Sequence, residues 1–251
     1  MEGEIGLIVD ASRQASRFLL RDYFELENLQ GSSRKTLAYS QRSCMKILQV
    51  LQEKLSKYFK TIIFDSKELT NLSFTDTAIL VETIDGFANL TRSLPFFSIM
   101  ITVLKIKNDQ VIAEKSVMNF PILGEIYYVE KGRGTWLERF NINFPGALRL
   151  RVSGIDNIEE AIATTNFNTL EIAKILPNLR LYDSYTYSIA QLVSGKLDVA
   201  IIRPSEISNL GCKLFIDEAV GAYHEQNQTI IASNIPLHDK IKHLVDKIGK
   251  I

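Results

Sequence analysis

Two carboxylates lie three residues apart in the segment VETIDGFANL, which runs from Val81 to Leu90. Glu82 and Asp85 follow an apolar run and come just before Gly86, where a buried strand would end in a turn. Carboxylate oxygens suit Mg²⁺, and a helix beginning at Gly86 would present backbone N–H groups to a phosphate. The spacing is therefore typical of a metal-phosphate site, but the same two residues would also serve simply to end a strand and cap a helix.

The composition limits the kinds of protein that this chain can be. Its 251 residues are 46% hydrophobic and 23% charged, which predicts one compact globular body. Lys plus Arg equals Asp plus Glu at 29 each, so we predict neither a nucleic-acid nor a membrane partner. No stretch approaches the ~20 apolar residues of a spanning helix, and we expect a cytoplasmic protein. The two cysteines, Cys44 and Cys212, are expected to be reduced core thiols.

Apolar spacing predicts the elements that must position the two carboxylates. Steps of three and four residues indicate one amphipathic helix over residues 5–24 and a second up to about Phe59. An antiparallel meander follows, with strands at 61–64, 78–81, 96–106, 111–118, 126–130 and 135–137. Strands and helices then alternate, with helices at 184–194 and from 206 to near 221, strands at 197–202 and 229–232, and a last amphipathic helix.

These patterns indicate a layered α+β or α/β protein. No linker separates two independent domains, and we expect a single unit of residues 1–251. A joint near Pro145-Gly146 would divide it into an N-terminal α+β half, about 1–145, and a C-terminal α/β half, about 146–251, which share a core.

The residues around the carboxylates resemble a known family. Glu82 to Asn89, followed by Leu94 to Phe97, is similar to the Asp-Pro-Ile-Asp-Gly-Thr-x-Asn segment and the later Pro-Phe-Phe of the inositol monophosphatase family. Further similar segments follow in the family's order, at 124–127 with 131–137, 184–198, 218–221 and 230–234. The resemblance extends over nearly the whole chain. It implies an αβαβα sandwich that binds two or three Mg²⁺ ions, hydrolyses phosphomonoesters of inositol, sugars or nucleotides, and is often a homodimer.

The resemblance also implies roles for individual positions. Asp85 matches a metal-binding aspartate, and Glu82 stands where the family has another aspartate. The backbone N–H groups of Gly86, Phe87 and Ala88 would bind the phosphate. Phe87, however, occupies the position of the threonine whose hydroxyl helps to activate the attacking water, and a phenyl ring cannot form that hydrogen bond.

Other positions of the implied metal site have changed. Asp65 is the best candidate for an upstream metal carboxylate, and Glu68 is the second. Gln41 stands at a third aspartate position, and Ser208 stands at a fourth, with Asn209 within a one-residue shift. A unit charge pair at ~4 Å contributes about 4 kcal/mol at an effective dielectric constant near 20, so two neutral replacements should lower Mg²⁺ affinity by orders of magnitude. The residues that remain predict Mg²⁺ binding that is weak or lost.

Three interpretations follow from these substitutions. An active phosphatase would use Asp65, Glu82 and Asp85 to bind Mg²⁺ and would hydrolyse a small phosphorylated polyol or sugar. A pseudoenzyme would keep the fold as a ligand-sensing or protein-binding body, with a protein partner and little hydrolysis. A changed activity is the third. The neutral residues at catalytic positions favour the pseudoenzyme.

Overall fold

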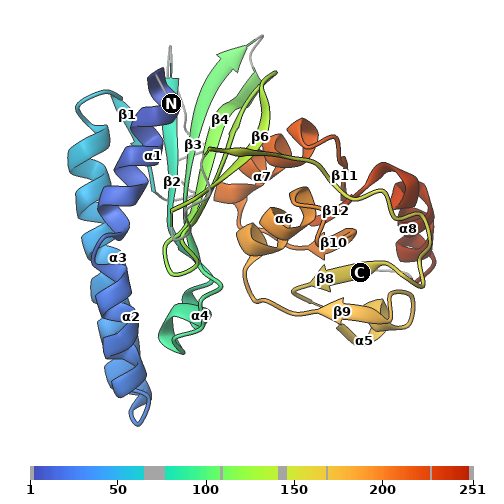
Figure 1. Cartoon of the computed structure of the whole chain (residues 1–251), viewed down its shortest axis with the longest axis horizontal. Helices are drawn as coiled ribbons and strands as arrows, with labels where there is room; N and C mark the ends of the chain where they lie inside the picture. Colours follow the sequence, from blue (N-terminus) through green and yellow to red (C-terminus); the bar gives the residue numbers. More distant parts are fainter. Residues whose placement is uncertain are drawn as a thin grey trace.

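The structure consists of two β-sheets with helices on both faces of each (Figure 1). It is a computed structural model that describes residues 3–64, 77–107, 110–140, 146–167, 169–226 and 228–248, with the side chains of these residues except at 169, 206–208 and 248. In the described residues no helix is long and apolar enough to cross a membrane. Within the described ranges the strands are arranged as a seven-stranded sheet, β1-β2-β3-β4-β5-β6-β7, and a five-stranded sheet, β11-β12-β10-β8-β9.

The chain begins with helices that cover the outer face of the first sheet (Figure 1): α1 (Gly3–Ser16), α2 (Leu19–Asn28) and α3 (Ser33–Leu55). The prediction of one continuous helix over residues 5–24 was wrong, because the chain turns between α1 and α2. Ser12 and Ser16 donate their hydroxyls to the backbone carbonyls of Val9 and Arg13, at 2.8 Å and 3.1 Å. Such hydrogen bonds compete with the helical ladder and often bend a helix. Apolar periodicity alone does not reveal this break.

The first sheet confirms the predicted meander from its second strand onward. Its strands are β1 (Thr61–Ile63), β2 (Thr77–Asp85), β3 (Ser98–Lys107), β4 (Gln110–Phe120), β5 (Glu125–Glu130), β6 (Gly134–Arg139) and β7 (Leu148–Leu150), with the short helix α4 (Phe87–Thr91) after β2. All neighbours from β2 to β7 are antiparallel, but β1 pairs with β2 in parallel. More than a dozen residues separate β1 from β2, which is the length that a parallel crossover requires.

The C-terminal half forms the second sheet, whose elements alternate as predicted. It contains β8 (Ile162–Thr165), α5 (Thr169–Ala173), β9 (Asn178–Arg180), α6 (Tyr185–Val193), β10 (Val199–Ile202), α7 (Glu206–Glu218), β11 (Ala222–Gln226), β12 (Thr229–Ser233) and α8 (Ile235–Ile248). Strands β8, β9 and β10 are parallel to one another, while β12 runs antiparallel to β10. The first sheet extends through β7 to Leu150, a few residues beyond the predicted joint.

Alternating side chains divide the core into three layers. In β2, Ile79 and Val81 pack against α1 to α3, whereas Ala78 and Leu80 face the other way, toward α6 and α7. In β10, alternate residues face either the layer of α6 and α7 or the outer layer of α5 and α8. Helices α6 and α7 therefore lie between the two sheets. This order of layers is the αβαβα sandwich that the family resemblance implied (Figure 1).

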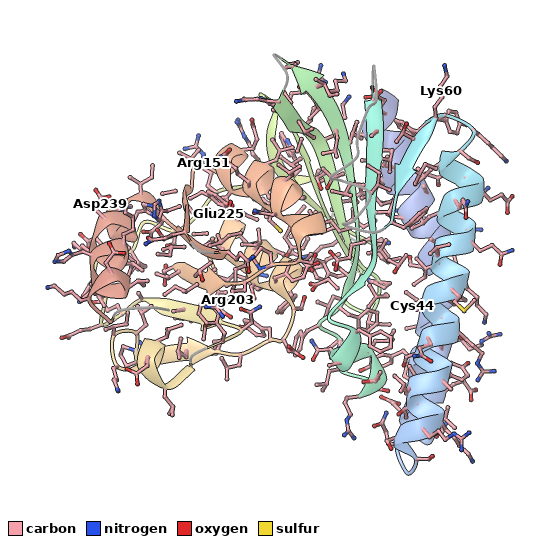
Figure 2. The ribbon with its side chains drawn as sticks, turned by 180° about the vertical axis from the view of Figure 1, so that it is seen from behind. Cys44, Lys60, Arg151, Arg203, Glu225 and Asp239 are labelled. Carbon is pink, nitrogen blue, oxygen red and sulfur yellow. The ribbon has the colours of Figure 1, made fainter. Side chains whose placement is uncertain are left out.

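The two cysteines lie in different surroundings. Cys212 of α7 is fully buried in the layer between the sheets, as predicted. Cys44 lies on α3 in the outer helical layer (Figure 2), where it is only partly buried and packs against the edge of the core. Both are free thiols.

Candidate functional site

A local irregularity in β2 brings Glu82 and Asp85 to the same side of the sheet. Side chains alternate along a strand, so residues three apart normally point to opposite faces. The register against β3 shifts between these two residues: Glu82 pairs with Met100 and Asp85 pairs with Ser98. Three steps along β2 thus match two along β3, and both carboxylates contact residues of α6.

The carboxylate of Asp85 is buried and surrounded by donors from the start of α6. Its Oδ2 accepts hydrogen bonds from the Ser184 hydroxyl at 2.5 Å, from the Thr186 backbone N–H at 2.9 Å and from the Thr186 hydroxyl. Ser184 also caps α6, because its hydroxyl accepts from the backbone N–H of Tyr187 at 3.1 Å. The residue that begins α6 therefore also connects this helix to the end of β2.

Burial and hydrogen bonding act in opposite directions on Asp85. Loss of hydration raises the pKa of its carboxyl to about 6 from the ordinary 3.8, although the hydrogen bonds from Ser184, Thr186 and the Gly86 backbone lower it in part. The same surroundings act on Cys212, where burial and then the charges of Asp85 and Glu82 raise the pKa of the thiol. Cys212 therefore borders the site as a neutral thiol.

Glu82 receives its donors from two other segments. The phenol of Tyr185 in α6 donates to Glu82 Oε2, and the hydroxyl of Ser205, just before α7, donates to the same oxygen at 3.2 Å. The hydroxyls of Tyr185 and Ser205 also lie 3.2 Å apart. Both carboxylates are thus bound by hydroxyl groups from the C-terminal half.

The predicted phosphate-binding residues continue directly from Asp85. Gly86 has φ +79°, and a Cβ at this position would lie 2.6 Å from the backbone oxygen of Phe96. Ala88 is exposed, whereas the Phe87 ring packs against the core that β2 shares with α1 to α3. The Phe87 side chain is therefore part of the packing of the outer helical layer.

Asn89 connects this loop to the C-terminal half. Its amide nitrogen lies 2.8 Å from the Phe96 carbonyl oxygen and 2.6 Å from the Tyr182 carbonyl oxygen. Asn89 is buried, and these contacts hold α4 against the segment that leads into α6. The loop after β2 and the start of α6 are thus positioned together.

Of the other predicted site residues, only Gln41 and Asn209 have side chains that the structure describes, and neither bonds to Glu82 or Asp85. Asp65 and Glu68 lie outside the described residues. Gln41 is exposed on α3. Ser208 lies in the first turn of α7, where its side chain is not described, and the neighbouring Asn209 bonds to Tyr223 and Glu225 of β11.

The donor set determines how well the site suits a metal ion. Among the described residues, no group of three or more His, Cys, Asp or Glu side chains could hold a metal ion. Glu82 and Asp85 alone fit a single Mg²⁺ that keeps most of its water ligands. An ion bound there would compete with the hydroxyls that already donate to both carboxylates. The described residues therefore fit one weakly held ion.

Sequence reasoning missed Tyr185, Thr186 and Ser205 as site residues. The helix beginning near Ser184 was predicted, and the match over 184–198 located it. Nothing in the local pattern, however, indicates that hydroxyls from two later segments reach carboxylates about a hundred residues earlier. Their role follows only from the packing of α6 and α7 against the first sheet.

Known proteins of similar sequence and structure were found. No family model matches the chain. An inositol-1-monophosphatase of Caulobacter vibrioides is 26% identical over 260 residues, which cover 93% of this chain and 97% of that protein. A Nus factor SuhB of Buchnera aphidicola is 20% identical over 234 residues, which cover 87% of this chain and 82% of that protein. The crystal structure of the extragenic suppressor protein suhB from Bartonella henselae matches with a TM-score of 0.76 and 19% identity, over 98% of this chain and 99% of that one.

Proposed function

Because the chain belongs to the inositol monophosphatase family, we propose that it keeps the family's ligand site but hydrolyses phosphomonoesters slowly or not at all. One observation carries this proposal. The hydroxyls of Tyr185, Ser205, Ser184 and Thr186 are bound to the two carboxylates on which metal binding depends. The ligand we propose is a small phosphorylated polyol or sugar, bound with or without a weakly held Mg²⁺.

Phe87 supports the same conclusion from the chemical side. A phenyl ring can neither position a water molecule nor accept its proton, and this ring is packed into the outer helical layer. Loss of a positioning or acid-base group typically lowers a rate ~10²–10⁴-fold. Glu82 and Asp85 would still hold Mg²⁺, which would polarise the phosphoryl group when bound. The chain's own residues then bind and orient the ligand without an efficient means of activating water.

The alternative is an active phosphatase with a reduced metal site, in which Asp65 completes the ligands of Glu82 and Asp85. This alternative is favoured by the side-by-side placement of the two carboxylates at the end of β2. The homodimer, the protein partner and the cytoplasmic location predicted from the sequence also stay proposals.

A phosphate-release assay decides between slow hydrolysis and ordinary turnover. With inositol and sugar monophosphates and saturating Mg²⁺, we expect a rate far below the ~10 s⁻¹ of a typical enzyme. The control is Glu82→Ala, because a contaminating phosphatase would survive this substitution. Turnover near ~10 s⁻¹ that disappears in Glu82→Ala would overturn the proposal and establish the alternative.

The hydroxyl of Tyr185, which donates to Glu82, should weaken Mg²⁺ binding. In Tyr185→Phe the ring remains but the donor is lost, so an incoming ion need not displace a hydrogen bond to a charged group, which contributes about 1.5–3 kcal/mol. We expect Mg²⁺ affinity to rise about tenfold or more, measured by isothermal titration.

Tyr187→Phe is the matched control for this titration. Tyr187 lies in the same helix, and its ring packs against Phe96 and Tyr182. Its substitution should leave Mg²⁺ affinity unchanged. If Tyr185→Phe bound Mg²⁺ no more tightly than the wild type, the hydroxyl would not be competing with the ion.

A further inference from the structure

The edge of the second sheet nearest the carboxylates carries an arginine with no part in the proposed metal site. Strands β8 and β10 are parallel neighbours, so their carboxyl ends lie at the same edge, which is where open α/β sheets bind ligands. Asn166 and Phe167 follow β8, while Arg203 and Ser205 follow β10. Ser205 reaches Glu82, so the loop that carries Arg203 also contacts the candidate site.

The backbone of Arg203 is fixed by one side chain from the neighbouring strand end. The amide nitrogen of Asn166 donates to the Arg203 carbonyl at 2.9 Å, and the Arg203 backbone N–H donates to the Asn166 amide oxygen, also at 2.9 Å. This pair of hydrogen bonds continues the contact between β8 and β10 beyond their ladder. The residue that carries the guanidinium is therefore held in place.

The guanidinium itself is oriented from two further directions. Its central carbon lies 4.1 Å from the centre of the Phe167 ring, and its Nε donates to the Thr229 hydroxyl at 3.3 Å. Thr229 is buried at the start of β12, so this acceptor belongs to the framework of the sheet. A planar group held by stacking and by Nε has already lost most of its rotational freedom before a ligand arrives.

Arg203 is exposed, and none of the ion pairs among the described side chains includes it. Arg13 and Arg139, by contrast, form ion pairs with Glu138 and Glu125. With Nε bonded to Thr229, the two terminal nitrogens present the planar arrangement that binds an oxyanion through two hydrogen bonds.

We propose that Arg203 binds a second anionic group of the ligand, a phosphate or a carboxylate, beside the phosphate ester bound near Asp85. The proposal rests on the proposed function, since it adds a contact to the same ligand. It assigns to the site a preference for sugar or polyol phosphates that carry one additional negative group.

Isothermal titration at 0.15 M salt tests this preference with three probes: a neutral sugar monophosphate, a sugar bisphosphate and a phosphorylated sugar acid. We expect Arg203→Gln to weaken binding of the probe with the matching second anion at least tenfold and to change monophosphate binding less than twofold. Whether the bisphosphate or the sugar acid shows this loss identifies the second group.

Two further variants separate a placed arginine from general positive charge. Arg180→Gln is the matched control, since Arg180 is an exposed arginine at the end of the neighbouring strand β9 and should leave all three affinities unchanged. Phe167→Leu keeps the charge of Arg203 but removes the stacking, and we expect an intermediate loss of several-fold. Thermal unfolding verifies that each variant is folded.

The outcomes distinguish this proposal from the proposed function. The role of Arg203 would be overturned if Arg203→Gln bound the bisphosphate and the sugar acid as tightly as the wild type does. It would also be overturned if the substitution weakened the binding of all three probes equally. Failure of the wild type to bind the monophosphate would overturn the proposed function, while the other two probes would still test Arg203. If the wild type bound none of the probes, both proposals would fall.

Discussion

Relative to the wild type, Asp85→Asn should gain up to about 3 kcal/mol of stability between about pH 4 and neutral pH when Mg²⁺ is absent. The pKa of Asp85 is raised to about 6 in the folded protein, from an ordinary value of 3.8. The folded protein therefore keeps this proton over a range in which the unfolded chain has released it. As the pH rises from about 4 to about 6, the free energy of unfolding of the wild type loses the contribution of this group, and the asparagine variant does not.

The measurement is urea unfolding of both proteins between pH 4 and pH 8 in the presence of a chelator, compared as a difference at each pH. Asp217→Asn is the control, because Asp217 is a half-exposed carboxylate paired with Lys213 on the surface of α7. A difference that stays constant with pH would contradict the raised pKa of Asp85. Added Mg²⁺ should reduce the advantage of the variant if the ion binds to Asp85, since binding to the folded state stabilises it.

Gly86→Ala should destabilise the protein strongly, by about 3–5 kcal/mol, because two costs add at one position. The backbone has φ +79°, which is unfavourable for any residue with a Cβ. The new methyl group would also lie 2.6 Å from the Phe96 carbonyl oxygen and 3.2 Å from the Phe97 Cα, so the backbone itself must move. That movement would displace the end of β2 and with it Asp85.

Gly132→Ala separates the two costs. Gly132 has nearly the same backbone conformation, with φ +78°, but no atom lies within 4 Å of a Cβ built there. We expect this control to lose only about 1–2 kcal/mol, measured as the free energy of unfolding in urea. Equal losses in the two variants would show that the Phe96 carbonyl does not restrict Gly86.

Local patterns predicted most of the framework of this protein. The apolar runs of β2 and β10 predicted two strands, and alternate residues of each strand are buried on opposite faces of its sheet. Gly86 likewise predicted the end of β2. These features could be predicted because they depend on residues that are adjacent in sequence. The break between α1 and α2 was missed because the apolar spacing continues across it, and the hydrogen bonds of Ser12 and Ser16 to the backbone leave no mark on that spacing. Short strands such as β7 and β9 have three residues each, too few for an alternation to be recognised.

The sequence predicted the two carboxylates of the candidate site but not the hydroxyl groups that bind them. Glu82 and Asp85 were identified from their spacing and their resemblance to a family segment, but the register shift that turns them to one side depends on the pairing with β3. The donors Tyr185 and Ser205 lie on elements whose positions depend on the packing of the whole sandwich. Hydroxyl-bearing residues are common in the chain, and spacing alone does not distinguish the few that reach the carboxylates.

The hydrogen bonds of Asn89 to the C-terminal half have a consequence for the order of folding. Its contact with Tyr182 joins residues 93 positions apart, and the bond from Ser184 to Asp85 spans 99. Contacts of such long sequence separation form slowly, because a large loop must close before they contribute. In refolding experiments we therefore expect helical signal and the first meander to appear before Asp85 becomes buried. Until both halves have folded, the two carboxylates are a pair of hydrated charges at the end of a strand.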